Sequence, residues 1–64
     1  MKVDLIQIFF ESCYIRNLEK VKACLTLGLD VNSVSKNRKS TGLGIAAEYD
    51  DLELLEYLLS FPLQ

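Results

Sequence analysis

Apolar residues in this chain recur at helical spacing in four short segments, which polar or glycine-containing breaks separate. In the first segment Ile6, Phe9 and Cys13 fall on one face, which predicts an amphipathic helix over about residues 4–14. A second helix is predicted over about residues 18–27, with Asn17 as its N-cap and Gly28 just beyond its end. The pattern of the first half therefore predicts one antiparallel helical hairpin.

The second half of the chain predicts another hairpin. Thr41 is expected to cap a third helix over about residues 42–49, and Asp50 or Asp51 to cap a fourth over about residues 52–60. With Asp50 as the cap, Glu53 completes an acidic capping box. The apolar stripe of the fourth helix is expected to be Leu52, Leu55, Leu58 and Leu59. Between the hairpins, residues 33–40 are polar and lack helical spacing, so we expect an exposed loop, called the finger loop below.

The two halves match when the chain is aligned with itself so that Leu18-Glu19 lies over Leu52-Glu53. The same offset pairs Val21 with Leu55 and Leu25 with Leu59. A fixed period of about 20–50 residues is the signature of a stacked repeat protein, and this offset falls within that range. We therefore predict one all-α domain over residues 1–64, with unit one at about 5–34 and unit two at about 35–61. Repeat stacks usually provide binding surfaces.

The residues that recur are similar to those of a known family. Unit one contains Asn17-Leu18-Glu19-Lys20-Val21-Lys22 and then Gly28, Asp30, Val31 and Asn32; unit two contains Thr41-x-Leu43-x-Ile45-Ala46-Ala47 and Asp51-Leu52-Glu53-Leu54-Leu55. In this order they resemble the ankyrin repeat. The resemblance implies stacked antiparallel helical hairpins with one exposed finger loop, and a protein–protein interaction function. Gly42 and Gly44 depart from the family's proline and histidine, and Lys39 stands where it has a turn glycine, so we expect a distorted finger turn.

The resemblance also suggests where another protein would bind. The predicted contact residues are Lys36, Arg38, Lys39 and Ser40 on the finger loop, and Tyr14, Glu48 and Tyr49 in the concave groove. The basic residues of the loop have a second interpretation as an ordinary solvated loop. The two tyrosines likewise suit either partner contact or the shielding of helix ends. Both alternatives stay open at the level of sequence.

Two units of this kind leave two open ends, and about three are normally needed to bury a continuous core. An alternative function is therefore structural: self-association into a homo-oligomer, or assembly with neighbouring repeats. The aromatic residues expected to mediate it are Phe9, Phe10, Tyr57 and Phe61.

The composition narrows the remaining function classes. The net charge of −2 gives no overall attraction to nucleic acid or to anionic lipid. The longest apolar run is far shorter than the ~20 residues of a membrane span, and no signal peptide is predicted. We therefore expect an intracellular, cytoplasmic protein that binds neither nucleic acid nor membrane.

Candidate catalytic and metal-binding residues are scarce. The chain has no histidine and two cysteines, too few for a four-ligand zinc site. It also lacks a nucleophile–base constellation and a phosphate-binding glycine loop. We expect no enzyme activity and no cofactor, and we expect Cys13 and Cys24 to pack as small hydrophobic side chains.

Overall fold

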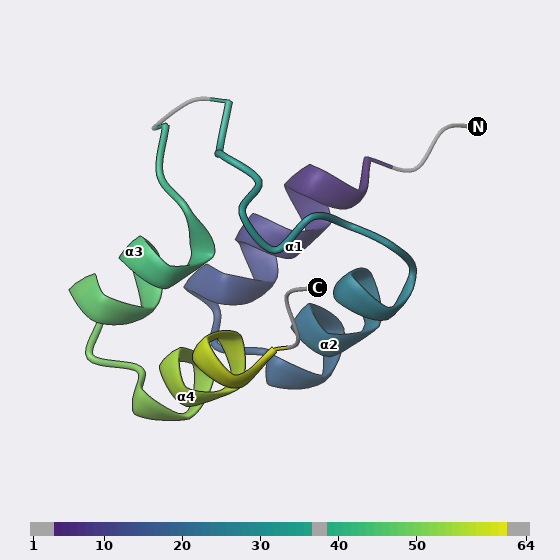
Figure 1. Ribbon diagram of the computed structural model, residues 1–64. Helices are drawn as coiled ribbons and strands as arrows, with labels where there is room; N and C mark the ends of the chain where they lie inside the picture. Colours follow the sequence, from purple (N-terminus) through teal and green to yellow (C-terminus); the bar gives the residue numbers. More distant parts are fainter. Residues whose placement is uncertain (1–3, 37–38, 62–64) are drawn as a thin grey trace.

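The computed structural model describes residues 4–36 and 39–61. Within these residues it contains four α-helices and no strand, as the hydrophobic pattern predicts. The helices are α1 (Leu5–Tyr14), α2 (Leu18–Thr26), α3 (Gly42–Glu48) and α4 (Leu52–Ser60). Helices α1 and α2 form one antiparallel hairpin, α3 and α4 form the other, and α1 packs against α3 (Figure 1). The all-helical fold class is thereby confirmed.

Each helix begins at a side chain that accepts a hydrogen bond from the backbone three residues later. Asp4, Asn17 and Thr41 cap α1, α2 and α3, with donor–acceptor distances of 3.3, 3.2 and 3.1 Å. Asp51 caps α4 by accepting from the Leu54 N–H at 3.3 Å. The capping box built on Asp50 is therefore wrong, because Asp50 precedes the actual cap and adopts a left-handed conformation.

The two hairpins turn in the same way, and this is where the internal repeat is visible in the structure. Arg16 and Asp50, which the repeat offset pairs with each other, both adopt positive φ, at 63° and 57°. The N–H of the residue that follows each then donates to a carbonyl in the last turn of the helix before it: Asn17 to Ser12 at 2.9 Å, and Asp51 to Ala46 at 2.8 Å. This closure satisfies helix-end carbonyls that would otherwise lack a partner.

The core lies between the two hairpins. Its buried apolar residues are Phe9, Phe10, Cys13, Val21, Cys24, Leu25, Ile45, Ala46, Leu54 and Leu58. Phe9 is fully buried, and its ring lies against Gly42 at the start of α3. A Cβ atom at position 42 would lie 2.9 Å from Phe9 Cζ, closer than side-chain atoms normally approach. The glycine therefore allows α3 to pack closely on α1.

The predicted apolar stripe of α4 is only partly correct. Leu52 and Leu59 are 62% and 65% exposed, whereas Leu54 and Leu58 are buried, so the predicted stripe of α4 holds only at Leu58 and in part at Leu55. The reason is that packing against the first hairpin sets the rotation of α4 about its axis.

Phe9 and Phe10 are also buried within the chain, so they cannot present a surface for self-association. Tyr57 and Phe61 are half-buried and contact each other, with ring centroids 5.9 Å apart. Self-association through these two residues stays a prediction.

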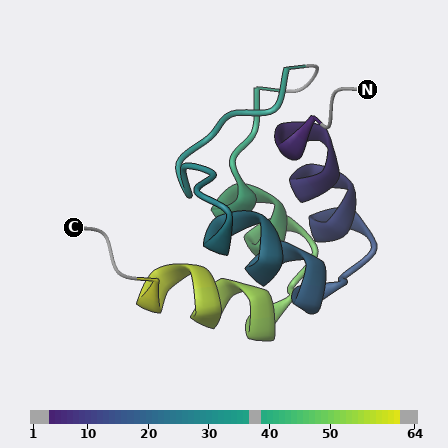
Figure 2. The same ribbon diagram turned by 90° about the vertical axis from the view of Figure 1, so that its right-hand side faces the viewer.

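The finger loop folds back on itself at its base. The Ser35 N–H donates to the Ser40 carbonyl at 2.7 Å, and the Lys39 N–H donates to the Ser35 carbonyl at 2.9 Å. Lys39 has a φ of 53°, so it adopts the left-handed conformation for which the ankyrin repeat uses glycine. Figure 2 shows that the loop arches over the end of the molecule where α1 begins.

Candidate protein-interaction surface

A hollow of 380 Å³ lies between α1 and the finger loop, and it is called the groove below. It is lined by Asp4, Ile6, Gln7, Phe10, Glu11, Tyr14, Ser35 and Lys36. Phe10 and Ile6 supply apolar side chains, while Gln7 and Glu11 supply polar groups from the same helix. The groove therefore combines apolar surface with hydrogen-bonding groups, which is the usual make-up of a peptide-binding surface.

An ion pair connects the finger loop to the start of α1. Lys36 Nζ lies 3.7 Å from Asp4 Oδ2, and both side chains are largely exposed. A solvated pair of this kind stabilises a protein by at most about 1 kcal/mol. The ion pair holds the cationic side chain of Lys36 at the edge of the groove.

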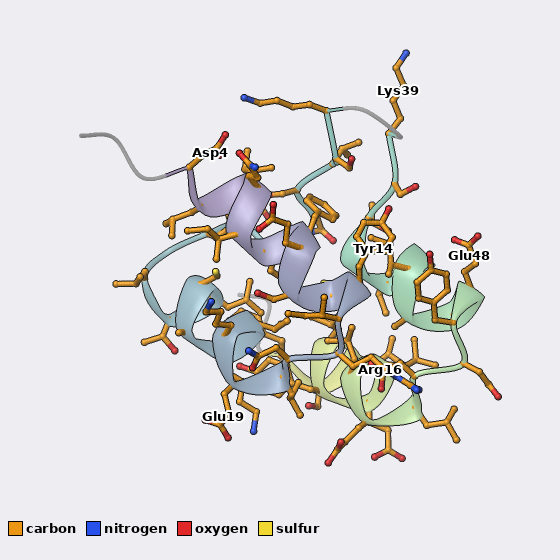
Figure 3. The ribbon with its side chains drawn as sticks, turned by 180° about the vertical axis from the view of Figure 1, so that it is seen from behind. Asp4, Tyr14, Arg16, Glu19, Lys39 and Glu48 are labelled. Atoms are coloured by element: carbon orange, nitrogen blue, oxygen red, sulfur yellow. The ribbon has the colours of Figure 1, made fainter. Side chains whose placement is uncertain are left out.

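The two predicted groove tyrosines contact each other. Tyr14 ends α1 and Tyr49 follows α3, and their ring centroids are 5.7 Å apart with the planes tilted by 52°. Tyr14 lines the groove, whereas Tyr49 is 42% exposed and is not among the residues that line it. The fold thus brings Tyr14 and Tyr49 together from different hairpins, and Glu48 lies on the same side of the molecule as Tyr14 (Figure 3).

The other predicted residues are placed differently. Lys39 points away from the body of the molecule (Figure 3) and does not line the groove. Ser40 closes the base of the finger loop through its backbone carbonyl. Arg38 lies outside the described residues. The described residues of the finger loop therefore do not form one compact site. Lys36 lies at the groove, and Lys39 points away from it (Figure 3).

Gln7 and Glu11 are groove residues that the sequence reasoning missed. Gln7 Nε2 donates a hydrogen bond to Glu11 Oε2 at 3.2 Å, which joins the two side chains along the exposed face of α1. The signal was present in the sequence, because Asp4, Gln7, Glu11 and Tyr14 recur at the three- and four-residue spacing of one helix face.

A second hollow, of 470 Å³, lies beside the turns of the two hairpins. Arg16 Nε lies 3.5 Å from Asp51 Oδ2 at this hollow, and Figure 3 shows Arg16 at the turn after α1. The other oxygen of Asp51 caps α4, so one buried carboxylate serves both contacts. We interpret this hollow as a structural junction between the hairpins.

Both cysteines are free and buried, as predicted for small apolar side chains. Burial, and to a lesser extent the nearby Cys24 and Asp51, raises the pKa of the Cys13 thiol to about 12. Burial also raises the pKa of Cys24, against an opposing effect of Lys20. Because the thiolate is the reactive form, neither thiol is prepared to act as a nucleophile at neutral pH.

Among residues 4–36 and 39–61, no group of three or more cysteine, aspartate or glutamate side chains is arranged to hold a metal ion. In that part of the chain, no helix has the length and apolar character needed to cross a membrane. Comparison with family models, with curated proteins and with solved structures gives no match. The ankyrin resemblance therefore stays a prediction from the residues of this chain.

Proposed function

We propose that this chain is a protein–protein interaction module that binds a peptide segment of another protein in the groove between α1 and the finger loop. The observation that supports it most directly is the placement of Tyr14, which lines the groove and contacts Tyr49 on the second hairpin. Exposed tyrosines on a rigid scaffold are frequent binding anchors, because they bury a large area while losing little side-chain entropy.

The chemistry of the groove suggests the kind of peptide. Ile6 and Tyr14 are half-buried and offer apolar contact in the groove, so the peptide would contribute an apolar or aromatic anchor. Gln7 and Glu11 line the same hollow and would accept hydrogen bonds from polar groups beside the anchor. Binding would require no chemistry, only complementarity to a surface held by two packed hairpins.

A peptide-display selection tests this proposal. A random phage-displayed library is selected against the immobilised chain, and enriched peptides are synthesised and measured by fluorescence anisotropy. We expect Tyr14→Ala, which removes a ring that lines the groove, to weaken binding about tenfold, since losses above about 1 kcal/mol are typical of anchor residues. The matched control is Leu27→Ala, because Leu27 is 70% exposed and lies outside the groove.

Two results would contradict the proposal. One is a selection that enriches no peptide above the level obtained with an unrelated immobilised protein. The other is a set of peptides whose affinity is the same for the wild type and for Tyr14→Ala, which would place binding outside the groove.

A further inference from the structure

The two hairpins repeat, so each residue of the first has an equivalent in the second at the offset that pairs Arg16 with Asp50. In the first hairpin, one face is covered by the second hairpin. Phe9 of this face packs against Gly42, and Val21 lies at the hollow that Leu54 also lines. Phe9, Cys13, Val21 and Leu25 of this face are all buried. This is the interface that joins the two units.

The equivalent face of the second hairpin is only partly covered by the residues that the structure describes. Its residues are Leu43, Ala47, Leu52, Leu55 and Leu59, and this set is called the outer face below. Leu59 is 65% exposed, whereas its equivalent Leu25 is 4% exposed. Ala47 is exposed where Cys13 is buried, and Leu55 is half-buried where Val21 is fully buried. An uncovered apolar face on a repeat unit usually marks a surface that another element covers.

Two positions of the first hairpin are charged where the second hairpin has buried apolar residues. Ile45 and Leu54, which the second hairpin buries towards the first, correspond to Glu11 and Lys20 of the first hairpin. Both of these residues are exposed. A polar end face is what terminates a repeat stack. The two hairpins therefore differ: the first has exposed charged side chains at these positions, whereas the outer face of the second has partly exposed leucines.

Charge is distributed just as unevenly. From residue 42 onwards the chain contains Glu48, Asp50, Asp51, Glu53 and Glu56 and no lysine or arginine. On α4, Glu56 lies four residues after Leu52 and three before Leu59, so its carboxylate borders the outer face. Acidic flanks favour a partner whose apolar surface is bordered by lysine or arginine.

We infer that the outer face binds a helical hairpin of a different protein, with an apolar face flanked by basic residues. A second copy of this chain fits poorly. Head-to-tail stacking would press Glu11 and Lys20 onto leucines, which costs the desolvation of unpaired charges. Face-to-face pairing would bring two acidic hairpins together. This surface is separate from the groove, so the inference is independent of the proposed function.

The test uses a probe built from the chain itself. Glu11→Ile and Lys20→Leu give the probe, at its first hairpin, the residues with which the second hairpin covers the first. Leu52→Lys and Leu59→Lys block the probe's own outer face. All four positions are exposed, so the probe is expected to keep the helical circular dichroism of the wild type. Residues 1–41 of the probe retain more lysine and arginine than aspartate and glutamate, so this half of the probe has a net positive charge.

Isothermal titration of the wild-type chain with this probe should show a one-to-one complex that weakens as salt is raised. Leu59→Lys in the target should weaken it at least about tenfold, because the leucine loses its apolar burial. Tyr14→Ala in the target should leave the affinity for the probe unchanged, which separates the outer face from the groove. A probe that keeps Glu11 and Lys20 is the matched control and should not bind.

Three outcomes would overturn the inference. The first is the absence of a complex with the probe. The second is a complex that Leu59→Lys in the target leaves intact. The third comes from sedimentation of the wild type alone: a dimer that Leu59→Lys dissolves would make a second copy the occupant of the outer face.

Discussion

The contact between Phe9 and Gly42 predicts that adding a single methyl group destabilises the fold. In Gly42→Ala the new Cβ would lie 2.9 and 3.1 Å from two atoms of the Phe9 ring and 3.3 Å from Leu58 Cδ1. Phe9 is 0% exposed, so its ring has no open space into which it can move. Either the ring leaves its preferred rotamer or α3 moves away from α1.

The expected size of the effect follows from two opposing terms. Overpacking a buried site typically costs about 1–3 kcal/mol. Replacing a helical glycine by alanine gains up to ~1 kcal/mol, and less at the first helical position that Gly42 occupies. We therefore expect Gly42→Ala to lower the free energy of unfolding by about 1–2 kcal/mol, which corresponds to a drop in Tm of about 4–16 °C for a domain of this size.

The change in the free energy of unfolding is measured by urea denaturation, with circular dichroism as the signal. A double-mutant cycle with Phe9→Leu tests whether the loss comes from the contact with the ring. The smaller side chain removes the ring, so Gly42→Ala should then be neutral or stabilising, with a coupling of about 1–2 kcal/mol. Gly44→Ala is the control, because its Cβ would meet only Thr41 Oγ1 at an ordinary 3.5 Å, and it should stabilise by up to ~1 kcal/mol. The reasoning fails if Gly42→Ala stabilises as much as Gly44→Ala, or if its cost persists beside Phe9→Leu.

Three further predictions concern local features. Lys39→Gly should raise the free energy of unfolding in urea by about 0.5–1 kcal/mol, because Lys39 has a φ of 53°; no gain would mean that the turn is unstrained. Asp51→Ala should cost about 1–2 kcal/mol through the lost cap of α4, whereas Asp51→Asn should cost less; equal losses would assign the effect to the contact with Arg16. Burial raises the pKa of Cys13 from 9.0 to about 12, so the folded chain keeps a proton that the unfolded chain releases. The stability from this thiol is therefore complete below pH 9 and is lost towards pH 12, by about 1.4 kcal/mol per pH unit. Urea titrations between pH 9 and pH 12 should show a smaller loss in the free energy of unfolding for Cys13→Ala than for the wild type. The same dependence on pH in both proteins would contradict the role of this thiol.

Some residues of the candidate interaction surface could be predicted from the sequence and others could not. Tyr14 and Tyr49 were selected by their positions in the repeat, and the structure brings their rings together. Gln7 and Glu11 were missed although they follow a helical spacing, because polar residues on an exposed face give no sign of what lies opposite them. The ion pair between Lys36 and Asp4 depends on where the finger loop folds, and no local pattern encodes that.

Local chemistry was sufficient to predict the helices and where they begin. The caps Asn17 and Thr41 could be read from the chain, and the cap of α4 could be narrowed to two aspartates, because a cap bonds to a backbone group only three residues away. Gly28, with a φ of 109°, likewise adopts positive φ just beyond α2, where its lack of a side chain permits it. The period of the internal repeat also needed nothing beyond the sequence.

Packing between segments that are distant in the sequence determined which side chains of α4 are buried and why position 42 is a glycine. They turn α4 so that Leu54 is buried and Leu59 exposed, although both residues are leucine and a helix can direct either one inward. They also explain Gly42, whose propensity argues against a helix but whose missing Cβ leaves space for Phe9. Such features depend on the packing of side chains that lie in different halves of the chain. The spacing of residues along one helix does not predict that packing.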